Sequence, residues 1–171
     1  MTQSNDNQAA ASQENPSSIT EKASFTAVGL RWEGSFAEAG AGSIRAMHER
    51  FLTQYETIPN RVPSPYFYGL SYHASPDAAG FVHYAVAEVS AITDIPEGML
   101  KLEVPALTYA RCDHFKGQSI DRSYQNIGRW IEEQGYRLAD TELTHFELYP
   151  LNQDPYSSDP EFTIMMPVEK A

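Results

Sequence analysis

Several residue types are scarce in this sequence of 171 residues, and each shortage excludes a class of protein. Its single cysteine, Cys112, excludes a framework of intramolecular disulfides. No apolar run approaches the roughly 18 residues of a membrane-spanning helix. No basic region followed by an apolar stretch indicates a signal peptide. We therefore expect a cytoplasmic protein that does not enter a membrane.

Basic residues are also few. The chain has 12 Lys and Arg against 23 Asp and Glu, which gives a formal net charge of -11. Binding to nucleic acid requires clustered Lys and Arg that neutralise phosphates, so the sequence predicts no direct nucleic-acid binding. An acidic field favours cationic ligands, although many proteins are acidic for solubility alone.

Motifs of metal and cofactor chemistry are absent from the sequence. It contains no HExxH, no Cys/His zinc spacing, no P-loop, no dinucleotide fingerprint and no G-x-S-x-G. Cys112 and His114 share a strand face, but no third ligand is in view. The sequence therefore predicts no metal and no cofactor.

The first 22 residues differ from the rest of the chain. They contain no aromatic residue and are rich in Gln, Asn, Ser and Ala. Such a segment cannot bury enough apolar area to offset the entropy lost on ordering. We therefore predict a disordered polar tail over residues 1–22 and a folded domain over residues 23–171.

The folded part divides into two similar halves, at about residues 23–95 and 100–169. Each half reads as strand, helix, strand, strand. A small-residue loop over residues 35–42 precedes a first helix that Ser43 can cap, and Ser119 can cap the second helix. The pattern predicts an α+β fold of two pseudo-symmetric β-α-β-β repeats side by side, with a central ligand cleft.

The segment "THFELYP", residues 144–150, reads as a strand with one charge in its middle. Alternation puts Phe146 and Leu148 on one face and Glu147 and Tyr149 on the other. From this pattern alone, Glu147 is either an ordinary solvent-facing residue or a carboxylate aimed into the cleft. In an apolar cleft, burial would raise its pKa, and a lipophilic cation would restore its charge pairing.

Several segments resemble the gyrase-inhibitor-like (GyrI-like) small-molecule-binding domain, which is also the effector-binding half of some AraC-type and MerR-type transcription regulators. They are "YFYGLSYH", "VHYAVAEV" and "IPEGML" in the first half, and "VPALTYARCDHFKG", "SYQNIGRWIEEQGY", "THFELYP" and "FTIMMPV" in the second. The resemblance covers about residues 23–169. It implies the two-repeat fold, and it implies that Glu147 faces the cleft, where this Glu of drug-sensing relatives pairs with cationic aromatic ligands.

The regulators carry a helix-turn-helix region, usually before this domain. The preceding segment here is polar and has no helical apolar period. The resemblance therefore implies a stand-alone effector-binding domain.

The pseudo-symmetry of the halves suggests further residues of the cleft. Aligning residues 68–71 with 146–149 puts Gly69 across from Glu147, on the opposite wall, and a one-residue shift would put Tyr68 there instead. The other candidates are aromatic: Tyr149, Trp32, Phe115 and Tyr72. For the two at the ends of the first strands, Trp32 and Phe115, plain core packing is the alternative.

Three functions follow from this interpretation, in order of preference. The first is a binding protein that holds a hydrophobic, cationic small molecule with Glu147 as anchor. The second is a hydrolase of electrophilic xenobiotics, as some GyrI-like proteins are described, in which Glu147 activates water as a general base. The third is a partner of another protein, such as gyrase or a regulator. No second catalytic group is evident, and the acidic charge is spread rather than clustered.

Overall fold

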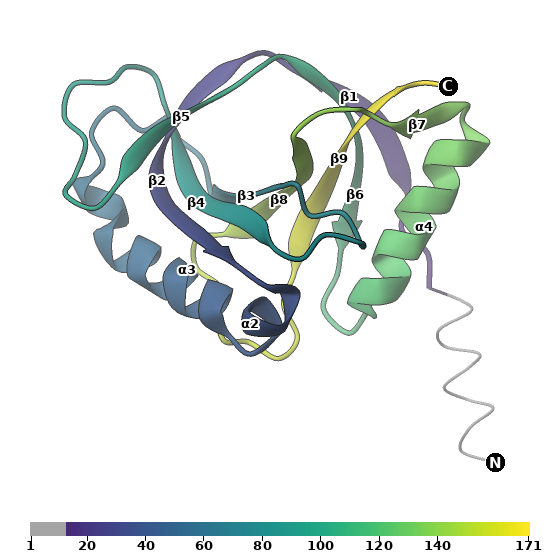
Figure 1. Ribbon diagram of the computed structural model, residues 1–171, viewed down its shortest axis with the longest axis horizontal. Helices are drawn as coiled ribbons and strands as arrows, with labels where there is room; N and C mark the ends of the chain where they lie inside the picture. The colour runs from purple at the N-terminus through teal and green to yellow at the C-terminus, as the bar shows by residue number, and fades with distance from the viewer. Residues whose placement is uncertain (1–12) are drawn as a thin grey trace.

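The computed structural model describes residues 13–171 and builds them around one curved antiparallel sheet (Figure 1). The sheet has nine strands in the order β1-β6-β9-β8-β3-β4-β2-β5, with β7 attached to β9. The strands are β1 Ser17–Lys22, β2 Phe25–Gly34, β3 Tyr66–Tyr72, β4 Phe81–Val89, β5 Leu100–Val104, β6 Leu107–His114, β7 Tyr136–Leu138, β8 Leu143–Pro150 and β9 Phe162–Lys170. The helices are α2 Phe36–Gly40, α3 Ser43–Gln54 and α4 Ile120–Glu133, with a 3-10 turn at Tyr55–Thr57. No helix in this described part of the chain is long and apolar enough to cross a membrane.

Each half of the chain contributes the same unit of strand, helix, strand and strand. The first unit is β2, α3, β3 and β4, and the second is β6, α4, β8 and β9, with the short β7 added after α4. The two units meet at the antiparallel pair of β3 and β8 in the middle of the sheet. The predicted α+β fold of two β-α-β-β repeats is therefore confirmed.

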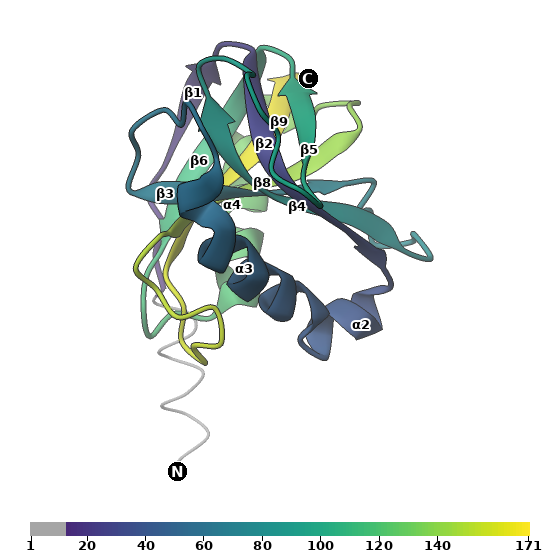
Figure 2. The same ribbon diagram turned by 90° about the vertical axis from the view of Figure 1, so that its left-hand side faces the viewer.

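Both long helices cover the same face of the sheet, each over its own unit. The buried Met47 and Phe51 of α3 pack on the first unit, and Ile127 and Ile131 of α4 pack on the second. The other face of the sheet curves around a separate core cluster that includes Phe146. Figure 1 shows α3 and α4 on two sides of the molecule with the central strands between them, and in Figure 2 α3 lies in front of α4 with most of the sheet above.

The N-terminal segment differs from the prediction. Residues 1–12 of the predicted tail lie outside the described residues, but Ser17–Lys22 forms β1 and pairs with β6. The prediction of disorder was therefore wrong for this strand. Ile19 packs against the cluster under α4, and the side chain of Asn15, only 8% exposed, donates hydrogen bonds to residues of the second repeat. In its described part, residues 13–22, backbone pairing and side-chain hydrogen bonds hold the segment in place, which needs no hydrophobic pattern in the sequence.

The predicted loop over residues 35–42 also differs, because it contains the short helix α2. Ser35 caps α2 through a capping box. Gly42, with a φ of 111°, takes the N-cap position of α3, so Ser43 is the first helical residue and not the cap. The equivalent Ser119 does cap α4, as predicted.

Candidate functional site

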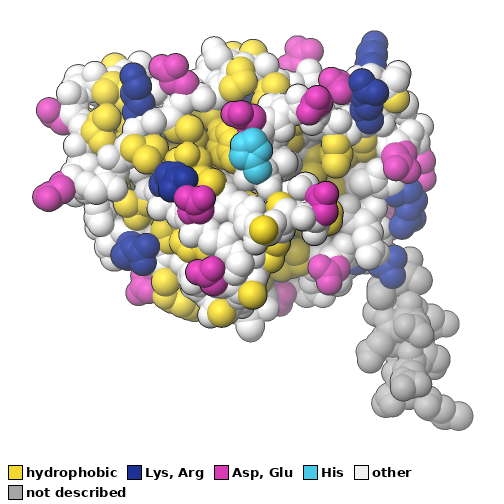
Figure 3. All heavy atoms as spheres, in the orientation of Figure 1, with side chains coloured by type: hydrophobic (Ala, Val, Ile, Leu, Met, Phe, Trp, Pro, Cys, Tyr) yellow, Lys and Arg dark blue, Asp and Glu magenta, His cyan; other side chains and the backbone are white. Residues whose placement is uncertain are grey.

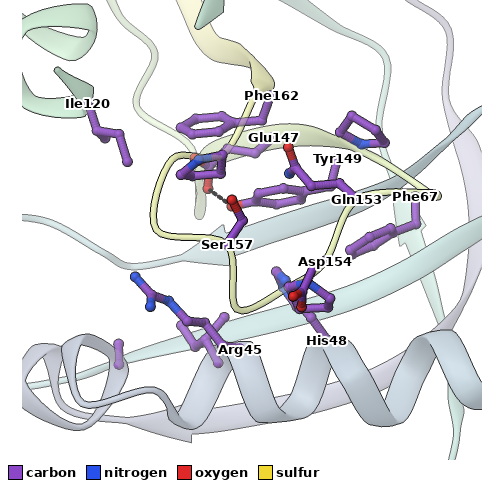
Figure 4. A pocket seen from close by; sticks show the side chains of 15 residues that line it. Arg45, His48, Phe67, Ile120, Glu147, Tyr149, Gln153, Asp154, Ser157 and Phe162 are labelled. Carbon is purple, nitrogen blue, oxygen red and sulfur yellow. Dashed lines mark hydrogen bonds between the residues drawn. The ribbon is translucent and has the colours of Figure 1, made fainter. Parts of the chain in front are cut away.

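A pocket of about 240 Å³ opens on the helix-covered face of the sheet, between the two repeats (Figure 4). Strands β3 and β8 contribute Phe67 and Tyr149, β9 contributes Phe162, and α4 contributes Ile120. Residues of α3 form another wall, and the loop between β8 and β9, at residues 153–160, borders the opening. The pocket is therefore built from both repeats and is largely apolar.

The carboxylate of Glu147 faces this pocket from β8. The Tyr124 hydroxyl, which reaches it from α4, donates a hydrogen bond of 2.7 Å to Oε2. The Tyr149 hydroxyl, two residues along the same strand, donates a hydrogen bond of 3.1 Å to Oε1. Within residues 13–171, Glu147 forms no ion pair. Two hydroxyl groups therefore hold the carboxylate, and no basic side chain neutralises it.

The surroundings shift the pKa of all three groups. Burial raises the pKa of Glu147 above its ordinary 4.5, and the two tyrosine hydrogen bonds oppose that rise. Burial, together with the Glu147 charge, raises the pKa of Tyr124 and Tyr149, so both remain hydroxyl donors. A buried charge without a counter-ion is costly. A cation bound beside Glu147 would reduce that cost.

A second polar cluster lies in the first repeat. The Nε2 atoms of His48 on α3 and His83 on β4 are 2.9 Å apart, and His83 Nδ1 is 2.9 Å from Ser71 Oγ on β3. Burial lowers the pKa of His48 to about 4 and lowers that of His83 well below its ordinary 6.5. Both rings are therefore neutral near pH 7, and one ring donates its N–H to the other.

Three of the predicted site residues lie together. Glu147 and Tyr149 line the pocket, and Gly69, which the sequence alignment made equivalent to Glu147, is its direct neighbour in the antiparallel pair of β3 and β8. Gly69 is a neighbour in the same sheet, however, and not a residue of the opposite wall. A Cβ atom at Gly69 would lie 2.7 Å from the Tyr149 ring and 3.1 Å from the His83 ring. The glycine thus leaves room for both rings.

The other predicted aromatic residues lie outside this pocket. Tyr68 and Tyr72 belong to the cluster on the opposite face of the sheet, because strand alternation turns them away from the face of Gly69. Trp32 packs against Phe81, with ring centroids 5.2 Å apart, which is the packing role given as its alternative. Phe115 is 51% exposed and does not line the pocket.

The residues of the site that the sequence did not single out include Tyr124, His48, Phe67 and Phe162. Helical spacing places Tyr124 on the apolar face of α4 together with Ile120, Ile127 and Ile131, which describes its ring but not its hydroxyl. A signal did exist, because Tyr124 and His48 each stand five residues after the serine of the repeated Ser-Ile pair. The duplication therefore marked both positions as equivalent.

Comparisons with known proteins agree on the fold. Residues 18–168 match the sequence pattern of the Cass2 family, described as integron-associated effector-binding proteins. The chain is 32% identical over 135 residues to the transcriptional regulator BrlR of Pseudomonas aeruginosa; this covers 77% of the chain and 47% of BrlR, so the chain spans about half of that protein's length.

Two solved structures are similar to this one. The C-terminal domain of EcmrR has a TM-score of 0.64 and 17% identity, over 93% of this chain and 100% of that chain. SAV2435 bound to tetraphenylphosphonium has a TM-score of 0.63 and 17% identity, over 92% of this chain and 94% of that chain. At this level of identity, the two likenesses show the fold.

Proposed function

Because the chain belongs to the Cass2 family of integron-associated effector-binding proteins, as its GyrI-like sequence resemblance led us to expect, we propose that it binds a hydrophobic organic cation between its repeats, with Glu147 as anchor. One observation carries the proposal: the Glu147 carboxylate faces an apolar pocket and, within residues 13–171, has tyrosine hydroxyls but no cation as partners.

The aromatic lining supports a cation rather than a simple apolar ligand. Phe67, Tyr149 and Phe162 offer ring faces or edges near the carboxylate. A cation over a ring face gains about 0.5 to 2 kcal/mol. A delocalised or shielded cation also costs less to transfer from water than a small one. The tetraphenylphosphonium bound to SAV2435 belongs to this class of ligand, which makes it a suitable probe.

The proposal is tested by titrating the protein with a charged and a neutral ligand of similar size. We expect tetraphenylphosphonium to bind more tightly than triphenylphosphine oxide, by about 1.4 kcal/mol or more, which is roughly tenfold. Only the cation gains from the carboxylate. Isothermal titration calorimetry measures both affinities. Equal affinities would mean that the pocket recognises aromatic bulk and not charge.

Arg45 gives a second test at the edge of the pocket. It lines the pocket from α3, it is exposed, and Figure 4 shows its side chain extending toward the side where Ile120 lies. Its charge opposes that of an incoming cation across solvent. We expect Arg45→Gln to raise the affinity for tetraphenylphosphonium by about 0.3 to 1 kcal/mol, roughly two- to fivefold, with the gain shrinking at high salt.

The matched control is Arg50→Gln, which removes an exposed charge from the same helix but away from the pocket lining. An equal gain in affinity in both variants would mean that the effect comes from the overall electrostatic field of the protein and not from the position of Arg45. A loss of affinity in Arg45→Gln alone would mean that the guanidinium contacts the ligand favourably.

Hydrolysis and protein binding stay predictions. Each oxygen of Glu147 accepts one tyrosine hydrogen bond and keeps a further lone pair that can accept from a water, so these bonds neither favour nor exclude hydrolysis. A protein that binds a partner by mimicking nucleic acid should carry clustered acidic side chains on its surface. On the face shown in Figure 3 they are scattered among basic and apolar ones. Cation binding remains the function that the geometry supports best.

A further inference from the structure

The two repeats place different polar groups at equivalent positions beside the pocket. The repeated Ser-Ile pairs make His48 of α3 equivalent to Tyr124 of α4, and the strand alignment makes Gly69 of β3 equivalent to Glu147 of β8. In the second repeat these two positions form the hydrogen bond between Tyr124 and Glu147. In the first repeat, Gly69 has no side chain that His48 could bind.

His48 is bonded instead to His83, whose ring occupies the space beside Gly69. A Cβ atom at Gly69 would lie only 3.1 Å from Cε1 and 3.4 Å from Nε2 of His83. The hydrogen-bonded chain of His48, His83 and Ser71 therefore takes the place in the first repeat that the carboxylate takes in the second. Its members are 5%, 2% and 7% exposed, so its geometry is fixed by packing.

His48 lines the pocket with one ring nitrogen that has no partner among residues 13–171. Its Nε2 is already engaged by His83, so Nδ1 is the ring nitrogen left for another partner. Within residues 13–171, two side-chain polar atoms are both sealed from solvent and unpartnered, Tyr109 Oη and His114 Nε2. His48 Nδ1 is not one of them, and no residue in that range bonds to it.

We propose that His48 is a second ligand contact and selects, among the cations that Glu147 anchors, those that also carry a hydrogen-bonding group. This inference rests on the proposed function. The ligand class is an aromatic cation with an N–H or O–H group, or a polar acceptor atom, on the side away from the carboxylate. A cation without such a group, such as tetraphenylphosphonium, uses only the Glu147 half of the site.

The hydrogen-bonded chain of His48, His83 and Ser71 can present either a donor or an acceptor to the ligand. If Ser71 donates to His83, then His83 donates to His48, and His48 Nδ1 carries a proton into the pocket. If both bonds reverse, Nδ1 offers its lone pair instead. No charge moves into or out of the site in this exchange, because both rings stay neutral. A ligand that donates an N–H therefore finds an acceptor without any buried histidine becoming charged.

A matched pair of cations tests the inference on the wild-type chain. The 9-aminoacridinium and 10-methylacridinium ions share the same three rings and charge, but only the first carries amine N–H donors. We expect calorimetry to show that the aminoacridinium binds roughly three- to tenfold more tightly, which is the worth of about one hydrogen bond. In His48→Phe, whose folding is checked by circular dichroism, this preference should fall to about one.

Nitrogen NMR of the imidazole rings provides a readout that a purely structural role would not change. Binding of aminoacridinium should move His48 Nδ1 to the chemical shift of an unprotonated nitrogen, and methylacridinium should leave it unmoved. This measurement, together with the wild-type preference, decides the matter even if His48→Phe fails to fold.

The outcomes separate the two proposals. If the wild-type protein binds both acridinium ions equally, and Glu147→Gln weakens both, the proposed function stands and the role of His48 is refuted. A preference that persists in folded His48→Phe refutes it as well. If neither acridinium ion nor tetraphenylphosphonium binds, the proposed function fails and the inference falls with it.

Discussion

Replacing Glu147 with glutamine is expected to lower the affinity for tetraphenylphosphonium by about 2 to 4 kcal/mol, roughly 30- to 700-fold. The amide has the shape of the carboxylate and can still accept a hydrogen bond from Tyr124 or Tyr149. It has no charge, however, so the bound cation would lie in an apolar pocket without a counter-ion. Titration calorimetry of the wild-type protein and the variant measures the difference.

The control for this substitution is Glu133→Gln, which removes the same charge from an exposed position on α4. It should change the affinity by less than twofold, since exposed charges are screened by solvent and salt. Thermal unfolding without ligand should show Glu147→Gln to be at least as stable as wild type, because a buried charge is removed. An affinity within threefold of wild type would exclude Glu147 as the anchor.

The second large effect is expected from pH. Burial raises the pKa of Glu147 above 4.5, and a bound cation lowers it again by favouring the charged form. Affinity for tetraphenylphosphonium, whose charge does not titrate, should therefore be greatest above the pKa of the free protein. It should fall by about tenfold per pH unit as pH drops below that value, until the pKa of the complex is reached.

Stability without ligand should have the opposite dependence on pH. A carboxyl group whose pKa is raised by folding stabilises the native state below its unfolded pKa of about 4.5, and this contribution is lost as pH rises through the folded pKa. His48 and His83, whose pKa values are lowered, destabilise the native state as pH falls below about 6.5. Subtracting the stability of Glu147→Gln from that of wild type at each pH isolates the contribution of Glu147. For binding, a difference in tetraphenylphosphonium affinity between wild type and Glu147→Gln that does not vary with pH would contradict the role of Glu147 ionisation.

Two kinds of sequence signal succeeded here, strand alternation and internal repetition. Alternation put Glu147 and Tyr149 on the same face, where the structure has them, and repetition aligned Gly69 with Glu147, two positions that the structure pairs across β3 and β8. Both signals depend on backbone geometry, which a regular pattern of side chains reports directly. The same alternation argues against Tyr68, because neighbours on a strand point to opposite faces.

Sequence patterns did not predict which polar groups at the ends of side chains meet, or that a polar N-terminal segment forms a strand. Helical spacing locates the face of a helix, but it does not tell that the hydroxyl of Tyr124 reaches a carboxylate on another element. Nor does it show that His48 and His83 meet, because that contact depends on how α3 sits over β4. The strand β1 was missed for a related reason: backbone pairing and hydrogen bonds from Asn15 order it with little apolar burial.

The pairing of Gly69 with Glu147 has a consequence for the shape of the ligand. These residues are equivalent in the two repeats and are also direct neighbours, so the axis relating the repeats passes between them. A perfectly symmetric chain would place two glutamates there, with Cβ atoms roughly 5 Å apart, and two buried carboxylates so close could not both ionise. The fold can therefore hold one charge at its axis, and the two sides of the pocket must differ. A symmetric dication would meet a carboxylate at one end and neutral imidazole at the other, whereas a cation with dissimilar ends matches both.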